Sequence, residues 1–254
     1  MKRLFPLIVI ATAAFGQSTA VLSQAEIEAL EAKVAANPTD RPSQKLLGKN
    51  YAYYITGVTA LSKYDLVDAV DPVKADSAFA IHARAELASS NSAGLVAEGG
   101  NALWGLSFQL LGYYALHHSP EGASSVTLAR SVGAHAIDRA ITLDPTEATW
   151  RSYRIPMLML RTSLTDSLKL SVPDAYVTVQ QDLAVMKGDV RNAMLGSAAK
   201  LAVQVGALDD AARYAQELLD SAASGGWNAG NAVFCGNMVL GQVALRRGDK
   251  DTAK

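Results

Sequence analysis

The chain has 254 residues, of which 50% are hydrophobic and 19% charged, a composition typical of globular proteins and unlike that of disordered chains. Its 23 basic and 24 acidic residues are scattered among one another, which excludes the basic surface that nucleic-acid binding requires. A chain of this length can bury a large core without disulfides. Its single cysteine, Cys235, excludes a disulfide bond within the chain. Because Cys235 lies in an apolar stretch, we interpret it as a small buried residue.

The first twenty residues have the pattern of an export signal. Lys2 and Arg3 precede an apolar run over 4–15, and small residues follow at 18–20, where signal peptidase requires them. The run is too short to cross a bilayer of roughly 30 Å as a helix. We therefore predict a cleaved signal peptide over 1–20, with no transmembrane anchor in the mature chain and a periplasmic or secreted location in a bacterium.

The rest of the chain, 21–254, is predicted to be one helical-repeat domain. Ser23 and Glu26 have the spacing of a capping box, so a helix is expected to begin there and to end before Pro38. Apolar residues at helical spacing predict three further helices in the first third, over 42–55, 58–70 and 72–89.

The middle of the chain begins with a small, glycine-containing stretch over 91–100, which we expect to be a loop or an irregular helix start. The next segment, 101–117, is apolar on nearly all sides and should form a central buried helix. After a loop over 118–124, Pro156 obscures the pattern of 146–170, because proline breaks or kinks a helix. The remaining helices are expected at 125–143, 173–187, 189–205 and 208–223, with a last pair beginning near Ala229. No stretch alternates as a strand does, so the predicted fold class is all-α.

One stretch has the spacing of a known repeat. Leu47-Gly48 is followed by Tyr51, Ala60, Tyr64 and Pro72. This pattern resembles the tetratricopeptide repeat, in which a small residue lets the two helices of a unit pack closely and a proline ends the second. The resemblance implies antiparallel helix pairs stacked as a right-handed solenoid, with room for about seven units of roughly 34 residues.

Weaker copies of the pattern surround Gly112, Gly206 and Gly241. The segment 230–249 also resembles the last helix pair of a group of uncharacterised exported bacterial tetratricopeptide-like proteins. Relatives in that group continue beyond this point, whereas this chain stops at Lys254 within what would be a second helix. We therefore expect the sequence to be a fragment that is truncated at its C-terminus.

The sequence has few candidates for a metal or a catalytic site. His117 and His118 with Glu121 have the residue types of a metal site, but zinc needs three or four ligands in fixed geometry, which adjacent histidines rarely supply. His82 and Glu86 fit a hydrogen-bonded surface pair, and His135 with Arg139 fits a structural one. No catalytic or cofactor-binding motif is present, so we assign no catalytic residue, metal ligand or cofactor.

Tyrosines and asparagines on the expected first helices of the pairs are the candidate binding residues. In peptide-binding tetratricopeptide proteins, asparagines on these inner faces clamp a peptide backbone, so the resemblance implies a concave groove. The candidate groove residues are Asn50, Tyr53, Tyr54, Asn101, Tyr114, Asn231 and Asn237.

The function predicted from these residues is that of a non-catalytic scaffold or a module that binds a peptide or protein. Two alternatives stay open. One is a small-molecule-binding component of an envelope transport system, which would require a closed apolar pocket, and the other is an all-helical hydrolase.

Overall fold

The computed structural model describes residues 21–61, 67–71, 75–117, 122–165, 167–223, 225 and 229–249. The predicted export signal, 1–20, and the last five residues lie outside these ranges. Within them the chain forms ten helices and one short β-hairpin. The helices are α1 (Gln24–Ala36), α2 (Arg41–Thr56), α4 (Ala78–Ser89), α5 (Ala93–His117), α6 (Gly122–Leu143), α7 (Ala148–Arg161), α8 (Val172–Val185), α9 (Gly188–Val205), α10 (Leu208–Ala223) and α11 (Ala229–Arg247).

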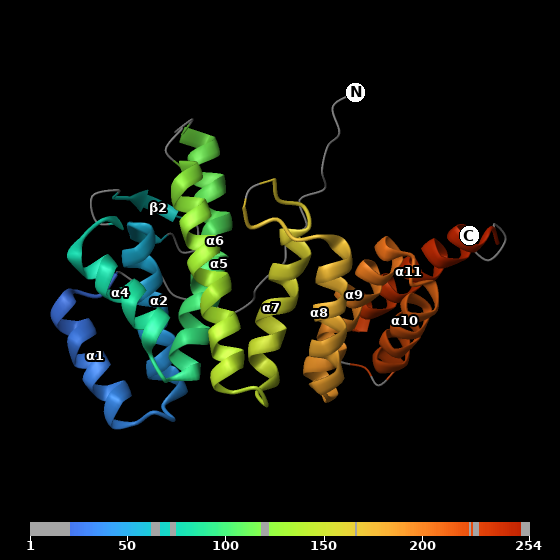
Figure 1. Ribbon diagram of the computed structural model, residues 1–254, viewed down its shortest axis with the longest axis horizontal. Coiled ribbons are helices and arrows are strands. Elements are labelled where there is room, and N and C mark those ends of the chain that lie inside the picture. Colours follow the sequence, from blue (N-terminus) through green and yellow to red (C-terminus); the bar gives the residue numbers. More distant parts are fainter. Residues whose placement is uncertain are drawn as a thin grey trace.

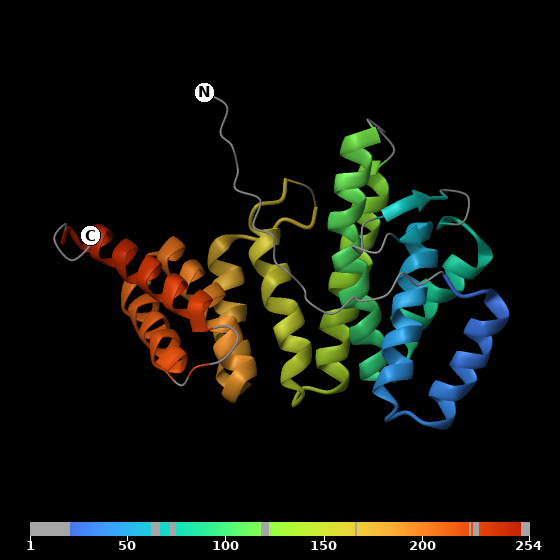
Figure 2. The ribbon, with the colours of Figure 1, turned by 180° about the vertical axis from the view of Figure 1, so that it is seen from behind.

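The helices follow one another along the longest axis of the molecule, from α1 and α2 at one end to α11 at the other (Figure 1). The reverse view shows the same order, with α7 in the middle (Figure 2). Consecutive helices from α5 to α11 pack on one another. In addition, α7 contacts α9, and α9 contacts α11. The all-helical prediction is thus confirmed in its coarse form. Within the ranges given above, no helix combines the length and apolar character needed to cross a bilayer.

The helix predicted over 58–70 is wrong. Residues Val58–Leu61 form strand β1 and Val67–Val70 form strand β2, paired antiparallel. Gly57 ends α2 in the left-handed conformation with φ 70°, and its carbonyl accepts a hydrogen bond from the Asp71 amide at 2.6 Å. This turn directs the chain into a segment rich in β-branched valines, which favour strands.

The hairpin also removes the second helix of the unit that resembled a tetratricopeptide repeat. Ala60, expected where two helices cross, lies on β1, while Tyr64 and Pro72 lie outside the described residues. Gly48 does lie at a helix crossing, but its partner is α5: a Cβ on Gly48 would lie 2.5 Å from the backbone nitrogen of Gly99. Gly48 therefore permits a close contact between two helices, as expected, but the partner helix is α5 and not the segment that follows α2.

A second glycine contact joins α5 to α6. A Cβ on Gly100 would lie 2.9 Å from the carbonyl oxygen of Gly133, and the reverse distance is also 2.9 Å. The segment 91–100, expected as a loop or an irregular helix start, contains the start of a helix: α5 begins at Ala93, and the backbones of Gly99 and Gly100 lie against α2 and α6. Such close backbone approach leaves no room for side chains and outweighs the low helix propensity of glycine.

The helix interrupted in the sequence by Pro156 is continuous. The proline lies inside α7, whose N-cap Glu147 accepts a hydrogen bond from the Thr149 amide at 2.9 Å. Arg151 and Arg154 of this helix pair with Asp182 of α8, which is fully buried, at 2.9 and 2.6 Å. These charge-assisted hydrogen bonds join the two helices.

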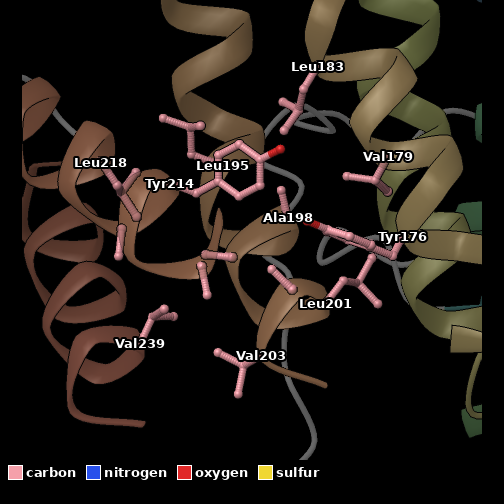
Figure 3. Close-up of a cluster of buried hydrophobic side chains, with 14 of the residues drawn as sticks. Tyr176, Val179, Leu183, Leu195, Ala198, Leu201, Val203, Tyr214, Leu218 and Val239 are labelled. Carbon is pink, nitrogen blue, oxygen red and sulfur yellow. The ribbon is translucent and has the colours of Figure 1, made fainter. Parts of the chain in front are cut away.

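A large apolar cluster forms the core of the second half of the chain. Side chains from α8, α9, α10 and α11 converge on it, among them Val179, Ala198, Tyr214 and Val239 (Figure 3). Burial of this cluster holds α9, α10 and α11 in fixed positions relative to one another.

Candidate functional site

The larger of two described hollows on the surface lies between α9 and α11. It is an open groove of about 550 Å³. Its lining residues are Lys200, Val203, Gln204, Met238, Gln242, Leu245 and Arg246. On each helix these positions are three or four residues apart, so they share one face.

The register of α9 and α11 follows from the packing of small residues. A Cβ on Gly196 of α9 would lie 3.7 Å from the Cβ of Cys235 on α11, and α10 packs against both helices. Cys235 is half-buried there, short of the full burial expected. Gly206, with φ 81°, ends α9 and permits the tight turn into α10. The groove therefore begins about one helical turn beyond the Gly196–Cys235 contact.

A polar network fixes α10 against α8 behind the groove. The carboxylate of Asp210 accepts hydrogen bonds from the Tyr176 hydroxyl at 2.5 Å, from Gln180 at 3.1 Å and from Arg213 at 2.5 Å. These donors lower the pKa of Asp210 below its usual value, with the Tyr176 bond as the largest cause. Burial and the neighbouring Asp210 carboxylate raise the pKa of Tyr176, so its hydroxyl stays protonated and keeps donating.

The groove combines an apolar floor with polar and cationic rims. Val203 is buried, whereas the side chain of Leu245 is 60% exposed. Lys200, Gln204, Gln242 and Arg246 make no hydrogen bond or ion pair with any other described residue, and no described acidic residue lines the groove. Amide and cationic donors are therefore available to a ligand beside exposed apolar surface.

Two of the sequence-predicted groove residues do clamp a backbone, but it belongs to the chain itself. Asn50 is buried; its Oδ1 accepts from the Leu22 amide at 3.0 Å and its Nδ2 donates to the Leu46 carbonyl at 2.9 Å. Tyr54 donates from its hydroxyl to the Leu22 carbonyl at 2.9 Å. Both backbone groups of Leu22 are thereby held against α2. Tyr53, on the same helix, is buried.

The other four predicted residues are not gathered with these. Asn101 is half-buried in α5, and Tyr114, further along α5, packs edge-on to Tyr113 at 5.6 Å. Asn231 and Asn237 are exposed on α11, outside the lining of the groove. The predicted residues therefore divide between the two ends of the molecule.

Sequence reasoning missed the two glutamines of the groove. Gln204 follows Lys200 by one turn of α9, and Gln242 precedes Arg246 by one turn of α11. Their one-turn spacing from a basic residue was visible in the sequence, but the sequence did not show that these two helices lie side by side.

Two of the three described histidines contact neighbouring side chains within the fold. His82, expected to pair with Glu86, instead contacts Glu31 of α1 at 2.9 Å, and the same carboxylate oxygen accepts from Tyr51 at 2.6 Å. His117 packs on Tyr113 at the end of α5, while His118 and Glu121 lie outside the described residues. Within the described part of the chain, no three histidine, cysteine or acidic side chains group as metal ligands would.

One carboxyl group is perturbed by its surroundings. Burial raises the pKa of Glu98 on α5 above the ordinary value, although Tyr153 donates to it at 3.2 Å and Lys45 and Arg41 oppose the shift. The nearby guanidinium of Arg41 lies 4.3 Å from the ring centroid of Trp150. This cluster joins α2, α5 and α7.

Fold and groove together define a mainly helical chain with an open, cation-rimmed groove between α9 and α11. Comparisons with protein-family models, with curated proteins and with solved structures gave no match.

Proposed function

We propose that this chain is a non-catalytic scaffold that binds a peptide or a protein segment in the groove between α9 and α11. The observation that carries the proposal is the groove itself, which is open, apolar at its floor and rimmed by side-chain donors without partners among the described residues. Exposed apolar surface beside unpartnered hydrogen-bond donors suits a ligand that brings both apolar side chains and hydrogen-bond acceptors.

The proposed architecture is a stack of helix pairs in the manner of a right-handed tetratricopeptide solenoid. In such stacks the first helices of successive pairs contact one another and line a shared surface. Contacts between α7 and α9 and between α9 and α11 support that arrangement for the second half of the chain.

The dimensions suit a short segment. From Met238 to Arg246 the groove extends about 12 Å along α11, given a rise of about 1.5 Å per residue. An extended peptide spans this length in about four residues, at roughly 3.3 Å each. With Lys200 and Arg246 at the rim, the matching segment has an apolar residue flanked by acidic ones.

The proposal includes export. If residues 1–20 are a signal peptide, the binding module acts in the periplasm or outside the cell. The hydrogen bonds that Asn50 and Tyr54 make to Leu22 support an ordered mature N-terminus directly after the expected cleavage point.

Fluorescence anisotropy with short labelled peptides tests the proposal. One peptide carries leucines flanked by glutamates, and the comparison peptide carries lysines in place of the glutamates. We expect the acidic peptide to bind at least tenfold more tightly, with an affinity that falls as salt is raised.

Two adjacent arginines provide the matched variants. Arg246→Glu changes the groove, whereas Arg247→Glu changes a side chain outside the groove lining that pairs with Asp209 at the start of α10. We expect the first to weaken binding of the acidic peptide about tenfold and the second to leave it unchanged. Equal binding of the two peptides, or equal effects of the two variants, would refute the proposal.

A further inference from the structure

A second hollow lies in the other half of the molecule, between α4 and α6, with a volume of about 420 Å³. Volumes of about 300–1,000 Å³ are usual for small-molecule sites. Its lining residues are Arg84, Leu87, Ala88, Val132, His135, Ala136 and Arg139. They come from one face of each helix, at spacings of three and four residues.

All titratable residues that line this cavity are basic. Arg84 comes from α4, and His135 and Arg139 come from α6. The lining includes no acidic residue from the described part of the chain, although the chain as a whole has 24 acidic residues against 23 basic ones. The two guanidinium groups therefore give this lining positive charge with no described acidic residue beside them in it.

The two arginines differ in how they are held. Arg139 donates from Nη2 to the carbonyl oxygens of Ser89 and Ser90, at 3.0 and 3.1 Å. These bonds anchor its guanidinium at the C-terminal end of α4, where backbone carbonyls lack helical partners. Its Nη1 has no hydrogen-bond partner among the described residues, and the guanidinium of Arg84 has none at all among them.

The floor of the cavity is apolar. Leu87 and Ala136 are buried, and Val132 lies beside them. Guanidinium groups recognise the planar, paired oxygens of carboxylates and similar anions, while this floor suits a hydrocarbon body.

We propose that the cavity between α4 and α6 binds a small organic anion, in which a carboxylate or sulfonate meets Arg84 and Arg139 and an apolar body covers Leu87 and Val132. This inference is independent of the peptide groove, since the two hollows share no residue.

Two dyes of the same shape and different charge test it. Anilinonaphthalene sulfonate carries an anionic group on an apolar body, and phenylnaphthylamine is its uncharged counterpart. In fluorescence titrations of the full chain, Arg84→Gln is expected to weaken saturable binding of the sulfonate about tenfold and to leave the uncharged dye unaffected.

Arg247→Gln is the matched control, because it makes the same chemical change at an exposed arginine that lines neither hollow. It should leave the sulfonate titration as in the unaltered chain. A second variant, Ala88→Phe, fills the cavity from an exposed position on α4 and should abolish sulfonate binding without loss of helical circular dichroism. Absence of saturable sulfonate binding to the unaltered chain, or equal losses in Arg84→Gln and Arg247→Gln, would overturn the proposal.

Discussion

Replacing Gly48 by alanine tests whether backbone contact between α2 and α5 organises the first half of the fold. The new Cβ would lie 2.5 Å from the Gly99 nitrogen and 3.0 Å from the carbonyl carbon of Glu98. Ordinary carbon contacts are about 3.5–4.0 Å, so the two helices would have to separate by about 1 Å. Neither contacting atom belongs to a flexible side chain that could move aside.

The expected magnitude follows from two opposing effects. Overpacking of this kind costs about 1–3 kcal/mol, whereas alanine stabilises a helix interior by about 1 kcal/mol relative to glycine. Because the clash is with backbone, we place the overpacking cost of Gly48→Ala toward the upper end of its range. The free energy of unfolding should then fall by about 2 kcal/mol in total. For a chain of this size that lowers the melting temperature by roughly 4–8 °C.

Gly105→Ala is the control, because it makes the same substitution on α5 where a new Cβ meets nothing within 4 Å. It should raise the melting temperature by about 2–4 °C through helix propensity alone. Thermal unfolding followed by circular dichroism distinguishes the two variants by the sign of the shift. If Gly48→Ala stabilised the chain as Gly105→Ala does, the inferred backbone contact would be wrong.

Three further substitutions probe other parts of the fold. Asp182→Ala should lower the free energy of unfolding by about 3–5 kcal/mol, because it leaves two largely buried arginines without their carboxylate partner. Asp209→Ala, at a fully exposed carboxylate, is the control and should leave the chemical denaturation curve unchanged. Asn50→Ala should cost about 1–3 kcal/mol and speed hydrogen exchange at the Leu22 amide; unaltered exchange there would contradict the backbone clamp. The raised pKa of Glu98 means that the folded chain holds this proton more tightly than the unfolded chain, so its ionisation lowers stability as pH rises above the ordinary value of 4.5. Glu98→Gln should therefore raise the melting temperature at pH 7 but not at pH 4, and a larger gain at the lower pH would disprove the sign.

Helix positions after α7 followed directly from the sequence. Residues 208–223 were predicted as a helix, and α10 has the same bounds, because two aspartates begin the segment and its apolar residues keep one clear face. The capping box of Ser23 and Glu26 is likewise present at the start of α1. These signals are local, so one sequence is enough to read them.

The errors arose where distant segments decide the outcome. The apolar segment after Gly57 fits a helix or a strand by its composition, and only pairing with 67–70 selects the strand. The glycines of 91–100 leave a loop and a helix start equally open until the backbones of α2 and α6 are in place. In both cases the deciding partner lies elsewhere in the chain and leaves no mark in the segment itself.

The candidate sites were harder to predict for the same reason. Asn50 has the residue type of a peptide clamp, yet its burial and its partner, Leu22, depend on how the N-terminal segment crosses α2. Gln204 and Gln242 became groove residues only once the register between α9 and α11 was known. Residue type identified what a side chain can bind, but packing decided whether a ligand can reach it.

The net charge of the whole chain conceals where its charged residues lie. The nearly balanced total predicts that nucleic acid is not a partner, because nucleic-acid binding requires a broad basic surface. Many described acidic residues, such as Asp182, Asp210 and Glu217, are engaged by neighbouring arginines within the fold. Both hollows, in contrast, have cationic rims without described acidic residues. Because nearby charge acts over about 10 Å at moderate salt, we expect each hollow to attract anionic ligands although the net charge of the chain is slightly negative.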